Sequence, residues 1–153
     1  GGGSIMSEKA AGNFVNSVRT MGFNSVAMYN MGGLDEDYLV YGANSLKIRE
    51  QMDSILDVPV FPCVSVGWDD TPRFPDKGIH DVVHYHNTPQ SFAALLAKAK
   101  KYADSHPEQP RLITINAWNE WVEGSYLLPD MLHGFGYLEA VREVILEGKY
   151  DKY

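Results

Sequence analysis

The sequence predicts an α/β fold in which parallel strands alternate with helices. Three short, almost continuously apolar segments, at residues 25–29, 60–66 and 112–117, are typical of strands that are buried on both faces of a sheet. Segments with apolar residues at helical spacing lie before, between and after these strands. The expected order is therefore helix-strand-helix-strand-helix-strand-helix, which is the pattern of parallel α/β proteins.

The first two helices are marked by their apolar spacing and by the residues at their ends. The first is predicted over residues 7–21, where Ser7 is a suitable N-cap and Gly22 a suitable stop. A second helical pattern covers residues 45–56 and stops before a proline.

Prolines mark several boundaries in the rest of the chain. Thr88 followed by Pro89 predicts the start of the third helix, because proline is favoured at the first helical position after an N-cap. The strand at residues 60–66 has prolines near its start, which predicts an irregular beginning. A last helix is expected around residues 138–145.

Composition excludes several classes of partner. The net charge is −7 and the 13 Lys and Arg are scattered, so the chain lacks the basic face that nucleic acid or an anionic membrane surface requires. The apolar runs are far shorter than the roughly 20 residues that span a bilayer. Cys63 is the single cysteine and is expected to be a buried small hydrophobe, so cysteine usage leaves the compartment open, including the periplasm and secretion.

Two architectures fit the predicted order: a small open α/β sheet, or part of a (β/α)8 TIM-type barrel. Residues 1–4 have the composition of a linker or cloning scar, which leaves residues 5–153 for the fold. A full barrel needs roughly 250 residues, so this chain would supply about three βα units, as the C-terminal portion of a longer barrel. A nucleotide-binding sheet is disfavoured, because no Gly-rich phosphate loop follows a strand and Gly32-Gly33 is too short to be one.

Polar and aromatic residues follow each predicted strand, which favours the barrel and indicates a site at the strand ends. The candidate substrate-binding residues there are Tyr29, Trp68, Asp69, Asp70, Trp118, Asn119 and Trp121. Tyr29 could instead close the core. Asp70 could cap the turn at Thr71-Pro72.

Glu120 and Glu123 are the candidate catalytic residues. If the strand continued, the two side chains would point to opposite faces, whereas a helical turn after Asn119 would bring them together. Two carboxylates held close can divide the roles of proton donor and acceptor, as in glycoside hydrolysis. The alternative is a pair of solvated loop acids beside core tryptophans, Trp118 and Trp121.

Arg73 and a histidine pair are two further polar features of the sequence. Arg73 is expected to pair with an aspartate and hold its loop, or to touch substrate. His84 and His86 alternate along one extended face, but no third ligand stands at a convincing spacing, so no metal is expected.

Three ordered motifs resemble a known family. Residues 116–124 read NAWNEWVEG and are followed by LLPD at 127–130 and GYL at 136–138. This run resembles the C-terminal signature of family-99 glycoside hydrolases, and resembles the related WbsX-like proteins, many of them labelled glycosyltransferases, more closely. Residues 67–73 (GWDDTPR) and the Asn-Thr-Pro at 87–89 with Phe92 are similar to further signatures of the group.

The resemblance implies a (β/α)8 barrel with these motifs at its last two strands. It implies a retaining hydrolase of α-linked, mannan-type glycans that acts in bacterial polysaccharide degradation without cofactor or metal. In that scheme Glu120 is the base that activates the sugar's own 2-hydroxyl, through a 1,2-anhydro intermediate, and Glu123 is the general acid/base.

A retaining glycoside hydrolase is thus the expected function. The alternatives are a glycosyltransferase of the WbsX-like group and a non-catalytic carbohydrate-binding fragment of a barrel. The expected ligand is an oligosaccharide or polysaccharide. An incomplete barrel exposes strand edges, so the missing N-terminal half, a second copy or another chain is expected to cover the sheet.

Overall fold

Short parallel strands form the centre of the molecule. The computed structural model describes residues 7–31, 36–79 and 82–150. Strand β1 (Val26–Ala27) pairs in parallel with β2 (Val60–Phe61), and β3 (Cys63–Ser65) pairs in parallel with β4 (Thr114–Asn116). The alternating α/β class and the parallel pairing are therefore confirmed.

Strands β2 and β3 are two parts of one extended segment, interrupted at Pro62. The carbonyl of Pro62 still accepts a hydrogen bond from the Thr114 N–H at 3.0 Å, and the carbonyl of Pro59 accepts one from Val26 N–H at 2.9 Å. Successive positions of a strand direct their carbonyls to opposite edges, so β1 and β4 flank this segment on either side. The irregular start that the prolines predicted is confirmed.

The helix ends match the predicted caps where the sequence indicated them. Helix α1 (Glu8–Met21) starts after Ser7, whose side chain accepts from the Ala10 N–H, and ends at Gly22 with φ of 71°. Helix α3 (Pro89–Ser105) starts after Thr88, which forms a capping box with Ser91. Helix α4 (Gly136–Ile145) closes the described chain near the predicted place.

Helix α2 (Tyr38–Ile55) begins seven residues earlier than the predicted pattern. Asp37 caps it by accepting hydrogen bonds from the Leu39 and Val40 N–H groups. The helix buries Asn44, Ser45 and Arg49 among its apolar residues. Because polar side chains share its buried face, the apolar periodicity shows only part of the helix.

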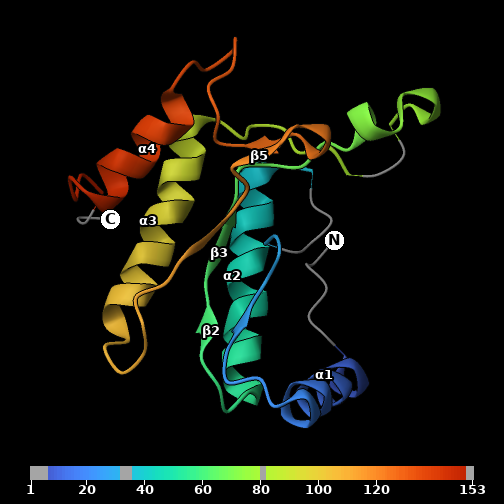
Figure 1. Ribbon diagram of the computed structural model, residues 1–153, viewed down its shortest axis with the longest axis vertical. Coiled ribbons are helices and arrows are strands. Elements are labelled where there is room, and N and C mark those ends of the chain that lie inside the picture. The colour runs from blue at the N-terminus through green and yellow to red at the C-terminus, as the bar shows by residue number, and fades with distance from the viewer. Residues whose placement is uncertain (1–6, 32–35, 80–81, 151–153) are drawn as a thin grey trace.

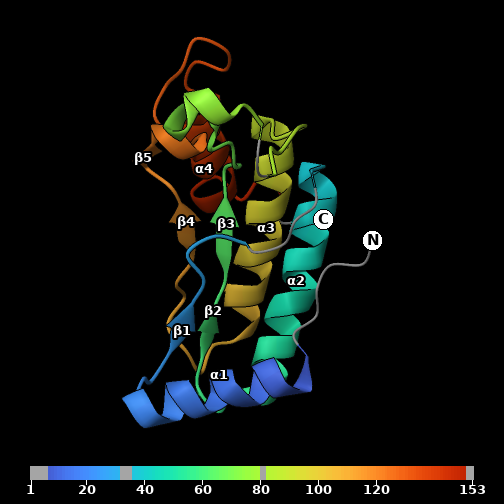
Figure 2. The same cartoon turned by 90° about the vertical axis from the view of Figure 1, so that its right-hand side faces the viewer.

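Helices α2 and α3 lie on one side of the strands. Figure 2 shows α2 and α3 along the same face of the strand layer, while α3 and α4 lie side by side in Figure 1. Tyr38, Phe92 and Leu96 are fully buried between β3 and these helices. No described helix is long and apolar enough to cross a membrane.

The structure contains short elements that the sequence did not predict. The strand β5 (Asn119–Glu120) pairs in an antiparallel manner with β6 (Ser125–Tyr126), and the 3-10 turn η3 (Trp121–Glu123) joins them. Two further 3-10 turns, η1 (Thr71–Arg73) and η2 (Pro75–Lys77), lie in the polar segment that follows β3. Residues 1–4 and Gly32-Gly33 lie outside the described residues.

Candidate active site

The predicted site residues gather where β3 and β4 end. The turns η1 and η2 and the β5–η3–β6 segment all lie at that end of the molecule in both ribbon views (Figures 1 and 2). Turn η1 contacts η3 directly. The carboxyl ends of parallel strands are where α/β proteins place their ligands.

The two glutamates share one arginine. The η3 turn follows Glu120 and brings Glu123 to the same side, so the helical-turn alternative for the pair is confirmed. Arg73 Nη1 lies 2.9 Å from Glu123 Oε1, and Arg73 Nη2 lies 3.4 Å from Glu120 Oε1. The expectation that Arg73 pairs with an aspartate is wrong, because η1 directs its side chain across to the η3 turn.

Glu123 is the more enclosed member of the pair. It is 6% exposed, whereas the Glu120 side chain is 37% exposed. Its Oε2 accepts a hydrogen bond from the Tyr29 hydroxyl at 2.9 Å. That bond to the carboxylate, with a smaller contribution from burial, raises the pKa of Tyr29 above its ordinary value. Tyr29 is largely exposed, so the alternative that it closes the core is wrong.

The backbone of the η3 turn is fixed against the loop that follows β3. The Asp69 N–H donates to the Glu123 carbonyl at 2.7 Å. Gly124 has φ of 59°, and a Cβ there would lie 2.9 Å from Asp69 Cβ and 3.1 Å from Asp69 N. Glycine is therefore required at this position by both its conformation and the closeness of Asp69.

Asp69, rather than Asp70, caps the turn at η1. Asp69 Oδ1 accepts from the Thr71 N–H at 3.0 Å and from the Thr71 hydroxyl at 2.6 Å. Asp70 precedes η1 but makes no side-chain capping bond to it, and it is buried. The capping alternative proposed for Asp70 is wrong, because the Asp69 side chain makes the capping bonds to Thr71.

The tryptophans stand at the surface. Trp118 is 57% exposed and Trp121 is 47% exposed, so the alternative that they are core residues is wrong. The Trp121 ring stacks on Tyr126 with centroids 4.1 Å apart. Trp68 is half-buried and Asn119 is exposed at the same end of the strands.

A buried polar network that the sequence did not predict lies at the end of β4, next to the site. Asn116, the last residue of β4, accepts hydrogen bonds at its Oδ1 from Ser65 Oγ at 3.0 Å and Ser125 Oγ at 2.7 Å. Its buried Nδ2 has no hydrogen-bond partner among the described residues. The available signal was a polar residue inside each of two apolar strands, since such groups need partners.

The histidines serve other contacts. His84 is buried and stacks on the Tyr41 ring with centroids 4.0 Å apart. His86 Nδ1 lies 2.8 Å from Asp37 Oδ2, the carboxylate that caps α2. Within the described ranges, no group of three or more His, Cys, Asp or Glu side chains is placed to hold a metal ion. Cys63 is buried, as predicted.

The comparisons with known proteins decide the family. The family model described as "Glycosyltransferase WbsX" matches residues 6–141, which is most of the chain. The chain belongs to this WbsX family. The main expectation from sequence, a retaining glycoside hydrolase, is contradicted by this match, whose description is that of a glycosyltransferase. The coarser expectation of a carbohydrate-active enzyme family agrees with it.

Two curated relatives are similar to part of this WbsX-family chain. Both are described as uncharacterized protein WxcX, and they come from two strains of Xanthomonas campestris pv. campestris. Each is 36% identical over 90 residues, which is 58% of this chain but only 12% of the relative. The relatives are therefore far longer than the chain. No solved structure matches it.

Proposed function

We propose that this chain carries the catalytic strand-end segment of a glycosyltransferase, with Glu120 and Glu123 as the carboxylate pair of its active site. The observation that carries the proposal is the glutamate pair, which one arginine holds together beside exposed tryptophans in a WbsX-family chain. A closely spaced carboxylate pair on the ends of parallel strands is suited to proton transfer at a sugar hydroxyl.

The proposed reaction joins an acceptor hydroxyl to an activated sugar donor that carries a leaving group at its anomeric carbon. The acceptor oxygen forms the new bond to the anomeric carbon, and the bond from that carbon to the leaving-group oxygen breaks. The leaving group departs with the bonding electron pair, and the hydroxyl proton passes to a carboxylate. Glu120 is the proposed acceptor of this proton, and the exposure of more than one-third of its side chain supports this role.

Aromatic and polar side chains around the pair would bind the sugars. Trp118 and Trp121 offer exposed ring faces, and the stacking of Trp121 on Tyr126 fixes its plane. Tyr29, Trp68 and Asn119 lie at the same strand ends. Asp69 and Asp70 complete the proposed set, although Asp69 also caps η1. Flat apolar rings beside hydroxyl-binding groups suit an oligosaccharide or polysaccharide ligand.

We further propose that the three strand segments are part of a (β/α)8 barrel. Support comes from their parallel pairing, from helices along one face, and from functional side chains at the carboxyl ends. The uncovered edges of β1 and β4 would pair with the N-terminal barrel half, with a second copy or with another chain. A monodisperse, cooperatively unfolding monomer of this chain at micromolar concentration would contradict the need for such cover.

The function is tested on a full-length protein that contains this chain. The protein is incubated with a panel of phosphate-activated sugars and oligosaccharide acceptors, and products heavier by one sugar are sought by mass spectrometry. We expect transfer by the wild type and by Glu50→Gln, an exposed control on α2, and loss of transfer in Glu120→Gln. Absence of transfer from any donor, or transfer that is unchanged in Glu120→Gln, contradicts the proposal.

A further inference from the structure

The side chain of Arg73 is aimed by a locked turn. Its backbone N–H donates to the Asp70 carbonyl at 3.0 Å, and the start of η1 is held by Asp69 through Thr71. The same loop is fixed to the η3 turn by the bond from Asp69 N–H to the Glu123 carbonyl. The arginine and the two glutamates therefore stand on two turns that are joined through the backbone.

Each end of the guanidinium contacts a different carboxylate. Nη1 lies 2.9 Å from Glu123 and Nη2 lies 3.4 Å from Glu120. We infer that Arg73 is a positioning residue, whose planar fork sets the separation of the two glutamates and compensates their repulsion. A lysine ammonium is a point charge without this fork, so it would not hold two carboxylates at a fixed spacing.

This role divides the work of the pair. Both oxygens of Glu123 are occupied, Oε1 by Arg73 and Oε2 by the Tyr29 hydroxyl. Glu120 receives only the longer contact from Arg73 and is the more exposed, so it is the carboxylate that can meet an acceptor hydroxyl. Glu123 is then the anchor that holds Arg73 in place. The division rests on the proposed function, whereas the positioning itself can be tested without turnover.

Removing the guanidinium should leave a receptor for a free one. In Arg73→Ala we expect both turns to keep their positions, so that the two carboxylates face the space that the guanidinium filled. Methylguanidinium should fill it, while methylammonium of equal charge should bind less well. Trp68, Trp118 and Trp121 are the three tryptophans of the chain, and all follow strand ends at this site, so intrinsic fluorescence reports on it.

The experiment titrates Arg73→Ala with methylguanidinium chloride at constant ionic strength and follows tryptophan fluorescence. We expect a saturable change in Arg73→Ala. The affinity should be at least about tenfold weaker in Arg73→Ala/Glu123→Gln, because charged hydrogen bonds are lost. The wild type should show no saturable change, because its own guanidinium occupies the place. Methylammonium chloride, a salt whose cation has the same charge, is the control titrant and should bind less well.

Equal responses of the single and double variants, or equal responses to both salts, overturn the positioning role. If Arg73→Ala does not fold alone, its circular dichroism is followed while each salt is added in the millimolar range. Recovery with methylguanidinium alone supports the role, and recovery with both salts or with neither overturns it. A full-length protein without transfer activity would remove the proposed function but would leave the outcome of this titration unchanged.

Discussion

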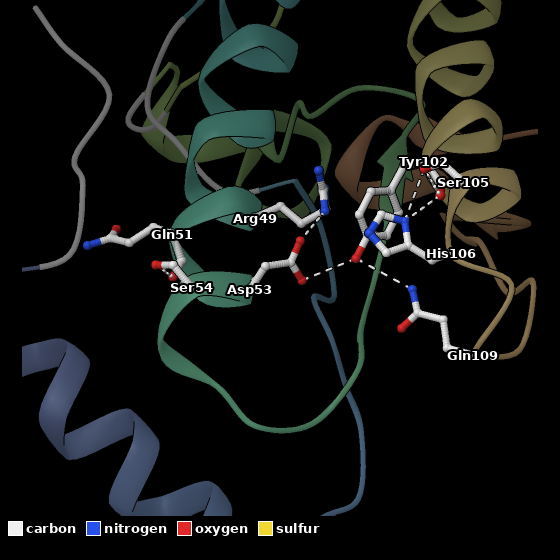
Figure 3. Close-up of polar contacts among 8 residues, drawn as sticks. All are labelled: Arg49, Gln51, Asp53, Ser54, Tyr102, Ser105, His106 and Gln109. Carbon is white, nitrogen blue, oxygen red and sulfur yellow. Dashed lines mark hydrogen bonds and ion pairs between the residues drawn. The ribbon is translucent and has the colours of Figure 1, made fainter.

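An arginine lies beside carboxylate groups at each end of the strand layer. The two clusters differ in the number of carboxylates and in how far the arginine is exposed to solvent. At one end Arg73 serves two glutamates and its side chain is 41% exposed. At the other, Arg49 on α2 pairs with Asp53 one turn along the helix, and its side chain is only 9% exposed. Figure 3 shows this second cluster between α2 and α3.

The second cluster joins two helices. The Arg49 guanidinium lies 3.6 Å from the centre of the Tyr102 ring, and the Tyr102 hydroxyl donates to Asp53 at 3.2 Å. The His106 ring stacks on the Tyr102 ring, with the two centroids 4.0 Å apart. One cation meets one carboxylate under an aromatic cover, which is the composition of a structural contact.

The difference separates a structural arginine from one at a candidate site. Arg73 contacts two carboxylates, whereas Arg49 contacts one, and the tryptophans near Arg73 are exposed. Function is therefore expected at the carboxyl ends of the strands, and stability at their amino ends.

The largest effect is expected from Glu120. Replacing it with Gln in the full-length protein removes the proposed base, so kcat for sugar transfer should fall by about 10²- to 10⁴-fold with little change in Tm. The opposite-end control is Asp53→Asn, which should lower Tm and leave kcat nearly unchanged. A fall in kcat of the same size in both variants would remove the functional distinction between the two clusters.

Arg49→Ala should produce the largest loss of stability. The substitution leaves Asp53 without its cation and uncovers Tyr102, and we expect a loss of about 2–4 kcal/mol in the free energy of unfolding. Urea denaturation followed by circular dichroism measures it. Arg73→Ala is the comparison, with a smaller expected loss because its guanidinium is more exposed. The reverse ranking of the two variants would contradict the structural role of Arg49.

Gly124 tests whether the candidate site depends on a close backbone contact. Gly124→Ala should cost about 1–3 kcal/mol, because a Cβ is strained at φ of 59° and meets Asp69 at 2.9 Å. Gly134→Ala is the matched control, with φ of 55° and no atom within 4 Å of the added Cβ. The difference between the two variants in urea denaturation measures the contact with Asp69 alone, and equal losses would show that the contact is unimportant.

Sequence predicted those features that depend on local chemistry. The caps of α1 and α3 follow from residues adjacent to the helices, and the strands follow from continuous apolar runs. The start of α2 was missed, because the missed part buries a polar residue, Asn44, among its apolar ones. The β5–β6 hairpin was missed because each strand is only two residues long.

The sequence indicated which residues gather at the strand ends, but it predicted only some of the contacts between them. The spacing of Glu120 and Glu123 left two arrangements open, and the η3 turn selected one. The partners of Arg73 lie some 50 residues further along the chain, and the Tyr29–Glu123 bond spans 94 positions. Contacts of this kind depend on how turns from different strands meet, for which a single sequence holds no local signal.

The smallest and most specific effect concerns the Tyr29 hydroxyl. Its pKa is raised above 10.0 chiefly by its bond to the Glu123 carboxylate, so Glu123→Gln should lower that pKa. The ultraviolet difference between the wild type and Tyr29→Phe isolates this phenolate from the other tyrosines. The pKa is higher in the folded state because folding stabilises the protonated form of the hydroxyl. The stability due to Tyr29 is thus complete below pH 10.0 and is lost as pH rises through the folded pKa. A difference titration that is the same with and without the Glu123 carboxylate would show that the two groups do not interact, and would leave Arg73 as the support of Glu123.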